Sequence, residues 1–359
     1  MAAAGVVGTL VAQIEDELDV VVERICDRIR EDIPDFRRLP RATLADAVRG
    51  NVSRALAALR ELRDPTEEEL ERAAAVGRER AEQGLTVDAV LHAYRISITA
   101  LWSRFGELAR GQGADVGTVL AFSETLWHWG DAVMDVVAAA HREVELEHAR
   151  EEQQRRDAFV FALLTGTLDA EELRRESATF GLDPERTYIA YRARGAKRLS
   201  GLEITLDHDL AGLAPEPPTA PPGATVGYAA PARLETLSTG FARASRALQT
   251  ALAFGEQGAF SLADLSIRPA ILADEALGDA FAERHLTPLE GLGMDFEDTL
   301  RAYLASGQKI EETAKALHVH ANTLRHRLRR FEEATGATLK DPRTVVELYW
   351  ALERRRLQR

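Results

Sequence analysis

Residues 310–331 have the sequence IEETAKALHVHANTLRHRLRRF, which predicts two short helices joined by a tight turn. The apolar residues recur at helical spacing in both: Ile310, Ala314 and Leu317 in the first helix, and Leu324, Leu328 and Phe331 in the second. Ala314 is small enough to let the two helices cross closely. The stretch therefore has the pattern of a helix-turn-helix.

The second helix of this pair is basic in a chain that is acidic. Four arginines and no acidic residue lie between Ala321 and Arg330, whereas the whole chain has a formal net charge of -13. Residues 295–359 hold 13 Lys and Arg against 10 Asp and Glu, and the preceding residues hold 32 against 48. Because such a chain has no general attraction for nucleic acid, the basic helix is a local feature with its own task.

The residues opposite the apolar stripe are of the types that read DNA: Asn322, Thr323, Arg325, His326, Arg329 and Arg330. Asparagine can bond adenine through two atoms, arginine can bond guanine, and threonine near a helix start can hold phosphate. Arg327 lies nearer the buried edge, where it would reach phosphate or pack along its stem. We predict that this helix binds double-stranded DNA. The alternative is an amphipathic surface helix with solvated arginines.

The bulk composition bounds the class of protein. A chain of 359 residues, 45% hydrophobic and 29% charged, has room for two or three domains. The single cysteine, Cys26, excludes an intramolecular disulfide and a cysteine-cluster metal site, and its helical spacing predicts a buried structural thiol. The apolar N-terminus has no leading positive charge, and no apolar run approaches the ~20 residues of a membrane helix. We expect a cytoplasmic protein with no membrane segment.

The first 150 residues predict a helical bundle. Helices are expected over residues 9–31 and 43–63, from Pro65 to Gly84, from Thr86 to Gly111, and from Val116 past His148. The apolar stripe of the last helix fades after Val144 into ELEHAREEQQRRD, residues 145–157. This stretch is a signalling helix or short coiled coil, or else a plain solvated helix.

Three histidines lie on these predicted helices: His92, His128 and His141. His92 lies beside an apolar stripe, as a haem ligand does, but no paired metal spacing such as HExxH occurs. A lone helical histidine is more often packed or solvated than ligating. We therefore expect no cofactor and no metal.

Residues 82–105, EQGLTVDAVLHAYRISITALWSRF, resemble the helical N-terminal sensor region of RsbRD-type stress regulators. Such domains are similar to globins that lack haem or to small helical bundles. The resemblance implies that residues 1–150 form an input domain for an unidentified small-molecule or protein effector.

The middle of the chain predicts a small α/β domain over residues 151–270. Helices are expected over residues 156–166 and 169–181, strands over 187–195, 201–210 and 225–231, and a helix over 234–255. The proline-dense segment 213–223 is expected to be a loop.

The run from TVGYAA through FARASRALQTA, residues 225–251, resembles the GGDEF-like middle domain of PucR/CdaR-type transcriptional regulators. A working nucleotide cyclase needs a Gly-Gly turn followed by metal-binding acids. No GGDEF or GGEEF string occurs, and Glu203, Asp207 and Asp209 are expected to be surface carboxylates. We expect a degenerate domain that relays signals or dimerises, and no enzymatic activity.

The C-terminal part, residues 271–359, predicts helices over 273–292 around Pro288, over 295–308 up to Gly307, and after LKDP. The stretch LRAYLASGQKIEETAKALHVHANTLRHRLRRFEEATG resembles the C-terminal helix-turn-helix of PucR/CdaR-type regulators, itself similar to the Fis-type DNA-binding unit. Ala321 stands where that family commonly has arginine, and His326 stands where tyrosine is frequent. The closing arginines would reach the DNA backbone or only solubilise the tail: Arg354, Arg355, Arg356 and Arg359.

Together these observations predict a mainly α, multidomain protein: an N-terminal helical bundle or globin-like domain, a small α/β middle domain and an all-α helix-turn-helix domain. The expected function is that of a one-component, sequence-specific transcriptional regulator, working at least as a homodimer because such motifs commonly bind paired half-sites. Two alternatives are a stress-signalling scaffold that binds only proteins and a nucleotide-binding enzyme.

Overall fold

The computed structural model describes residues 2–292 and 295–358. Among these residues, helices account for 69% of the structure and accompany one five-stranded sheet. This confirms the prediction of a mainly α, multidomain protein. The chain divides into two compact units, residues 1–153 and residues 154–359.

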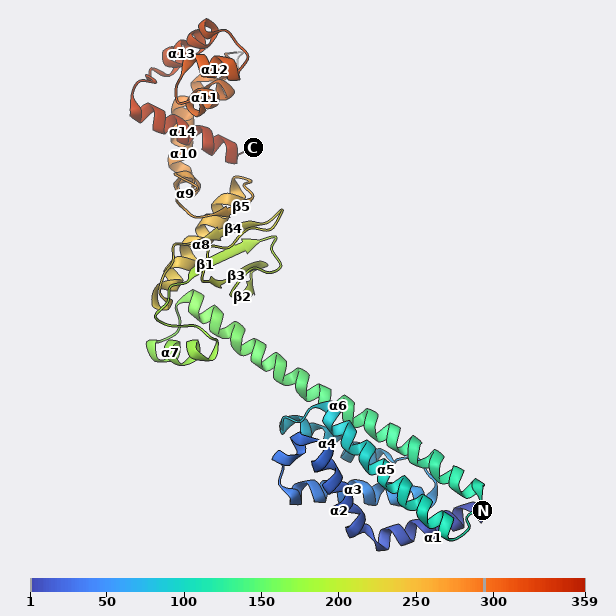
Figure 1. Ribbon diagram of the computed structural model, residues 1–359. Helices are drawn as coiled ribbons and strands as arrows, with labels where there is room; N and C mark the ends of the chain where they lie inside the picture. The colour runs from blue at the N-terminus through green and yellow to red at the C-terminus, as the bar shows by residue number, and fades with distance from the viewer. Residues whose placement is uncertain (1, 293–294, 359) are drawn as a thin grey trace. The chain divides into compact units, whose positions relative to one another are not determined.

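The first unit is a helical bundle, shown in blue to green in Figure 1. Its elements are α1 (Ala2–Asp16), α2 (Leu18–Asp32), the 3-10 helix η1 (Pro34–Arg38), α3 (Arg41–Glu61), α4 (Glu67–Glu82), α5 (Val87–Gly111) and the first part of α6 (Val116–Thr165). The single helix expected over residues 9–31 is wrong. The chain leaves helical geometry at Glu17 (φ -101°, ψ 13°), and both α1 and α2 pack against α3.

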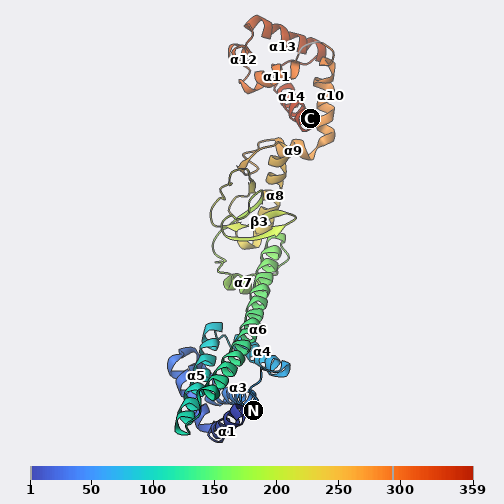
Figure 2. The same ribbon diagram turned by 90° about the vertical axis from the view of Figure 1, so that its right-hand side faces the viewer.

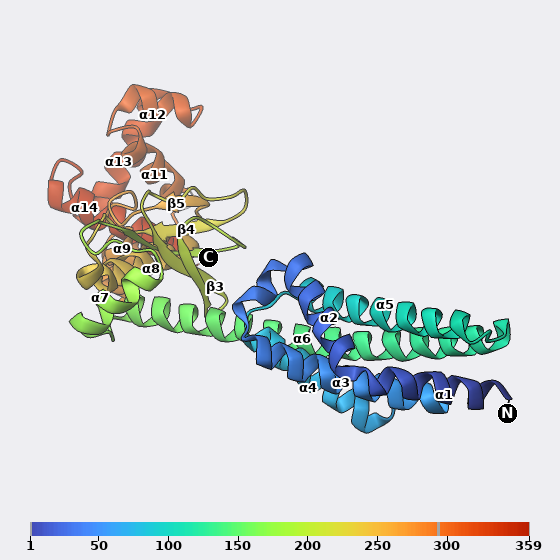
Figure 3. The same ribbon diagram turned by 60° about the horizontal axis from the view of Figure 1, so that its bottom comes forward.

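The core of this bundle is apolar and closely packed. Phe105 of α5 stacks on Phe122 of α6 with ring centroids 3.5 Å apart, and the two helices run side by side in Figure 3. Cys26 is 1% exposed, which confirms the prediction of a buried thiol. A Cβ at Gly77 of α4 would lie 2.5 Å from the carbonyl oxygen of Val137 in α6, so only glycine allows these backbones to approach.

Two threonines begin helices of the bundle. Thr86 caps α5, as expected, because its Oγ1 accepts a hydrogen bond from the Ala89 N–H at 3.3 Å. Thr66 caps α4 and forms a capping box with Glu69. Pro65 therefore precedes the cap of α4 and does not lie in its first turn, which corrects that prediction.

Helix α6 is 50 residues long and continues to Thr165. The separate helix expected over residues 156–166 is therefore wrong. No glycine or proline interrupts residues 131–165. The helix ends where Gly166, the residue after Thr165, adopts a positive φ of 74°. The charged stretch 145–157 lies within this helix, and its side chains are mostly exposed.

The second unit contains a sheet with strand order β2-β3-β1-β4-β5. Its strands are β1 (Ile189–Arg194), β2 (Leu202–Leu206), β3 (Asp209–Ala214), β4 (Thr225–Tyr228) and β5 (Gly258–Phe260). Strands β4 and β5 pair in parallel, and the other pairs are antiparallel. The single strand expected over residues 201–210 is two strands, because Asp207 and His208 adopt left-handed φ values (49° and 69°) and make a hairpin turn.

Helices complete the α/β part: α7 (Ala170–Thr179), the 3-10 helix η2 (Leu234–Thr236), α8 (Leu237–Ala253) and α9 (Arg268–Ala273). Helix α8 packs along β1 and β4 (Figure 1), and Gly227 of β4 allows this because a Cβ there would overlap the α8 backbone. Neither β5 nor α9 was expected from the sequence, since both are shorter than the windows in which a period is visible.

The acidic residues of this sheet depart from the prediction of surface carboxylates. Asp209 is 2% exposed and forms ion pairs with Arg192 (2.9 Å) and Arg194 (2.7 Å). The Glu203 carboxylate accepts a hydrogen bond from the Tyr191 hydroxyl at 3.1 Å. Asp207 alone is exposed as expected. The carboxylates of Asp209 and Glu203 therefore bond neighbouring side chains of the sheet, and these bonds offset the cost of removing them from water.

The last helices form a separate apolar cluster, seen together in Figure 2. They are α10 (Glu275–His285), the 3-10 helix η3 (Thr287–Leu289), α11 (Phe296–Ala305), α12 (Ile310–Ala316), α13 (Ala321–Thr335) and α14 (Pro342–Leu357). Pro288 lies in η3, and Gly307 (φ 61°) follows α11 as expected. Over the described ranges, none of the helices offers an apolar stretch of the length a bilayer requires.

Candidate nucleic-acid interface

Helices α12 and α13 are joined by a turn of four residues, 317–320. His318 takes a left-handed conformation (φ 54°) in this turn. His320 is the N-cap of α13, and its Nδ1 accepts a hydrogen bond from the Asn322 N–H at 3.2 Å. The turn thus fixes where α13 begins and which of its sides faces the rest of the domain.

The inner side of α13 is held by the core of the C-terminal cluster. Leu324 and Phe331 are fully buried, and Leu328 and Ala314 are nearly so. Arg327 also turns toward the domain, because its Nη1 donates to the Thr299 Oγ1 of α11 at 3.0 Å. Arg327 was expected either to reach phosphate or to pack along its stem, and the structure shows it engaged within the protein.

The outer side of α13 carries the six residues predicted to read DNA. Five are exposed: Asn322, Thr323, Arg325, His326 and Arg329. Arg330 is half-buried. All six lie on one helix, so the structure presents them as a single surface.

The arginines of this surface are weakly engaged within the protein. Arg325 donates to the Asn322 Oδ1 at 2.9 Å and to the Glu311 Oε1 at 3.3 Å. The side chain of Glu311 is 79% exposed, so this ion pair is screened by water. Within the described part of the chain, Arg329 and Arg330 have no acidic group within ion-pairing distance. Their charge is available to an anionic partner.

The tail arginines behave differently, and neither expected role fits Arg354. It is 8% exposed and pairs with Asp279 (2.8 Å) and Glu275 (2.9 Å) of α10. Arg355 pairs with Glu290 at 3.0 Å, and the Arg356 Nη2 donates to the Phe254 carbonyl oxygen at 2.7 Å. These three side chains thus form bonds within the protein. Arg359 lies outside the described residues.

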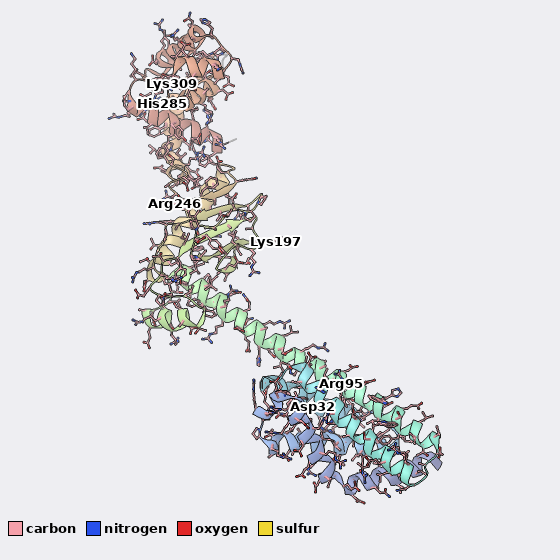
Figure 4. All side chains as sticks on the ribbon, viewed as in Figure 1. Asp32, Arg95, Lys197, Arg246, His285 and Lys309 are labelled. Atoms are coloured by element: carbon pink, nitrogen blue, oxygen red, sulfur yellow. The ribbon has the colours of Figure 1, made fainter. Side chains whose placement is uncertain are left out.

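Sequence reasoning missed two residues that shape the interface. His320 was overlooked as a cap because histidine is not among the usual N-cap residues. Lys309, labelled in Figure 4, precedes α12 and pairs with Glu312 at 2.8 Å. The acids at positions 311 and 312 are the signal that could have marked this helix start, because negative charge is favoured in the first turn of a helix.

The three histidines of the bundle do not come together. His92 and His128 are exposed, while His141 is fully buried and its Nε2–H donates to the Leu85 carbonyl oxygen at 2.8 Å. In the ranges the structure covers, no three side chains of the metal-binding types gather at one point.

Two families of domains match this chain. Residues 19–156 match the RsbT co-antagonist protein rsbRD N-terminal domain, and residues 296–353 match the PucR C-terminal helix-turn-helix domain. These matches confirm the resemblances of the first and last parts of the chain. They place α11, α12, α13 and most of α14 within the second domain.

Several known proteins share shorter segments. The purine catabolism regulatory protein of Bacillus subtilis is 49% identical over 59 residues, which are 16% of this chain and 11% of that protein. An uncharacterized protein of Mycobacterium bovis is 38% identical over 79 residues, which are 22% of this chain and 19% of that protein. The chain thus spans less than a fifth of the length of these relatives.

A solved structure also aligns with part of the chain. The regulator of polyketide synthase expression from Bifidobacterium adolescentis is 21% identical, and the alignment covers 55% of this chain and 90% of that one with a TM-score of 0.23.

Proposed function

We propose that this chain, with an RsbRD-type domain near its start and a PucR-type helix-turn-helix near its end, is a one-component transcriptional regulator that binds double-stranded DNA. The observation that carries the proposal is the outer side of α13. It presents the exposed Arg325 and Arg329 and the half-buried Arg330 on a chain whose formal net charge is -13, and Arg329 and Arg330 have no acidic partner among the described residues.

The roles of five of the six residues follow from their positions along α13. Asn322, Thr323 and Arg325 lie in its first turns, the part of a recognition helix that contacts base edges. Arg325 and Asn322 already bond each other, so binding to bases would exchange this bond for bonds to purines. Arg329 and Arg330 lie further along the helix, where they would contact phosphates and set the orientation on the duplex.

The test is selection of duplexes from a random-sequence library by the full-length protein, followed by fluorescence anisotropy on the selected duplex. Changing Arg325, Arg329 and Arg330 together to glutamine should abolish specific binding and leave the circular dichroism spectrum unchanged. The matched control changes Arg78, Arg174 and Arg243, which are exposed and lie outside the C-terminal cluster, to glutamine. Equal losses in both variants would contradict a role specific to α13.

Dimerisation is part of the same proposal. One helix-turn-helix offers few contacts, and such motifs commonly occupy two half-sites about one helical turn apart. We place the pairing surface in α6 near residues 133–150, in the middle domain, or in both. Light scattering at micromolar concentration should give twice the mass of the chain, with or without DNA; a strict monomer under both conditions would oppose the proposal.

The remaining parts are proposed to control α13. Residues 1–150 would sense an effector, residues 151–270 would form a relay or dimerisation domain, and residues 271–359 would read DNA. The GGDEF-like character of the middle part stays a prediction. Support for the sensing role comes from the RsbRD-type match and from a cavity in the helical bundle.

A further inference from the structure

We propose that the first unit binds a small organic carboxylate in a partly open cavity lined by α2, η1, α3, α4 and α5. The cavity measures about 40 Å³, and its walls are mostly apolar, with Phe36, Leu44 and Val90 among them. Four polar side chains interrupt these walls: Asn51, Arg80, Tyr94 and Ser97. The Ser97 hydroxyl already donates to the Ala93 carbonyl oxygen at 3.0 Å. The inference that such a ligand acts as the effector rests on the proposed function. The inference that it binds in this cavity is independent of that function.

Arg80 is the reason to expect an anion. Its side chain is 3% exposed, and a guanidinium stays charged in a protein, so its burial needs a compensating group. The Arg80 Nη1 donates to the Gln83 Oε1 (2.5 Å) and lies 3.2 Å from the Glu79 Oε1. Glu79 is 49% exposed and offsets only part of the charge. Among the described residues, no partner accepts from the Nε and Nη2 of Arg80.

Tyr94 supplies a second donor on the cavity wall. It is 7% exposed, and within the described chain no group forms a hydrogen bond with its hydroxyl. Burial raises the pKa of Tyr94 to about 12, so the hydroxyl is protonated at neutral pH. The charged groups near it are Arg54 and Arg80, both cations. A hydroxyl without a hydrogen-bond partner and with two cations nearby favours an acceptor that carries negative charge.

The open side of the cavity lies between α3 and α4. The lining residues Ala47 and Asn51 of α3 and Val76 of α4 are half-buried, whereas those of α2 and α5 are mostly buried. The Asn51 amide thus lies near the mouth, and a ligand entering there would direct its charged end to Arg80. Figure 4 marks Asp32 at the end of α2 and Arg95 in α5, the two helices of the closed side.

The donor set distinguishes a carboxylate from other anions. A carboxylate is planar and accepts two parallel hydrogen bonds from one guanidinium, so the Nε and Nη2 of a single arginine suffice. A phosphate carries more charge and more oxygens than Arg80 and Tyr94 can satisfy in a small site with mostly apolar walls. The small volume and mostly apolar wall favour a hydrocarbon part of only one or two carbon atoms.

The test uses the full-length protein and four probes of a size that suits the cavity: acetate and propionate, with acetamide and propionamide as neutral analogues of the same shape. At least one carboxylate should raise the unfolding temperature and bind in calorimetry, and its amide should bind at least about tenfold more weakly. An amide that binds as tightly as its acid, or no response to either acid, would overturn the proposal.

Two variants locate the site. Tyr94→Phe removes only the hydroxyl and should weaken carboxylate binding about three- to tenfold. Arg80→Gln should weaken it at least about tenfold. Arg78→Gln, an exposed neighbour on the same helix, should leave it unchanged. If both single variants, Tyr94→Phe and Arg80→Gln, bind the carboxylate as tightly as wild type, the assignment is refuted. If Arg80→Gln does not fold, the affinity of Tyr94→Phe alone decides the test.

DNA binding is measured on the same preparations. Arg80→Gln should retain the duplex affinity of ligand-free wild type while losing the carboxylate. If no variant or wild type binds DNA but the carboxylate binds as described, the proposed function fails and the site stands. If DNA binds and no carboxylate does, the site fails alone.

Discussion

Arginine side chains in the C-terminal cluster have two different roles, set by what lies within reach of each. Arg354 meets two acids of α10 and is buried, whereas Arg329 meets solvent and no acid among the described residues. Arg327, two residues before Arg329, donates to Thr299. A basic residue therefore contributes to stability or to an anion-binding surface according to its partner, and its residue type alone does not decide this.

This difference predicts opposite effects of two neighbouring substitutions. Arg327→Gln should lower the free energy of unfolding by about 1 kcal/mol, because it removes the hydrogen bond to Thr299. Arg329→Gln should change it by less than about 0.5 kcal/mol and should weaken DNA binding instead. Urea unfolding and anisotropy on both variants check this, and a larger stability loss from Arg329→Gln would contradict it.

Glu69 links the start of α4 to the preceding loop and gives a dependence on pH. Its carboxylate accepts two hydrogen bonds from Arg63 (2.9 Å and 3.0 Å) and one from the Thr66 N–H. The Arg63 guanidinium, more than the backbone bond, lowers the pKa of Glu69 from 4.5 to about 2. The carboxylate therefore stabilises the fold above about pH 4.5, and this contribution is lost as the pH falls toward 2.

Glu69→Gln should accordingly lower the free energy of unfolding by about 1–3 kcal/mol at pH 7, and the difference from wild type should shrink to nothing near pH 2. Glu68→Gln is the matched control. Its carboxylate is 73% exposed and, among the described residues, pairs with Arg72 alone, so the change should cost less than about 0.5 kcal/mol. A Glu69→Gln effect that does not depend on pH would rule out this account.

At the scale of elements, α4 and α6 are joined by backbone contact. Gly77→Ala would place a Cβ 2.5 Å from the Val137 carbonyl oxygen, so the helices must separate and the free energy of unfolding should fall by about 1–3 kcal/mol. Gly106→Ala in α5 meets no atom within 4 Å and should raise it by about 0.5–1 kcal/mol, since alanine favours helix. Thermal unfolding of both variants would reveal the opposite signs, and equal effects would contradict the packing.

Elements with a local signal could be predicted from the sequence. The sides of α13 follow from a repeat within ten residues, and the start of α5 follows from Thr86. The break at Glu17 carries no glycine or proline, and it occurs because two helices must pack on α3. Similarly, the hairpin turn at Asp207 and His208 could not be predicted, because neither residue is a glycine or proline and both could also continue a strand.

The sequence predicted which side chains of α13 face outward, but it did not predict which arginines are already paired within the protein. Steps of 100° along α13 place Asn322, His326 and Arg329 outward, and the structure exposes these side chains. Which arginines are already paired depends on residues far away in sequence, as in the pair of Arg354 with Asp279. For the same reason, the buried position of Arg80 beside a cavity gave no sign in the sequence.

At the scale of the whole molecule, charge is distributed so that one helix differs from the rest. A formal net charge of -13 repels duplex DNA from most of the chain, and the exposed arginines of α13 oppose this locally. Under the proposed function, the acidic remainder suppresses non-specific binding and leaves orientation to α13. Binding should therefore depend steeply on salt, because phosphate contacts release counterions from the duplex.

The most direct test of DNA binding through α13 is the salt dependence of affinity for a selected duplex, measured by anisotropy from 50 to 300 mM potassium chloride. For wild type, the logarithm of the association constant should fall linearly with the logarithm of salt concentration, by about 0.9 per phosphate contact. Replacing Arg329 and Arg330 with glutamine should make that slope shallower by about 2 per protomer. An unchanged slope, or wild-type binding that does not respond to salt, would contradict the account.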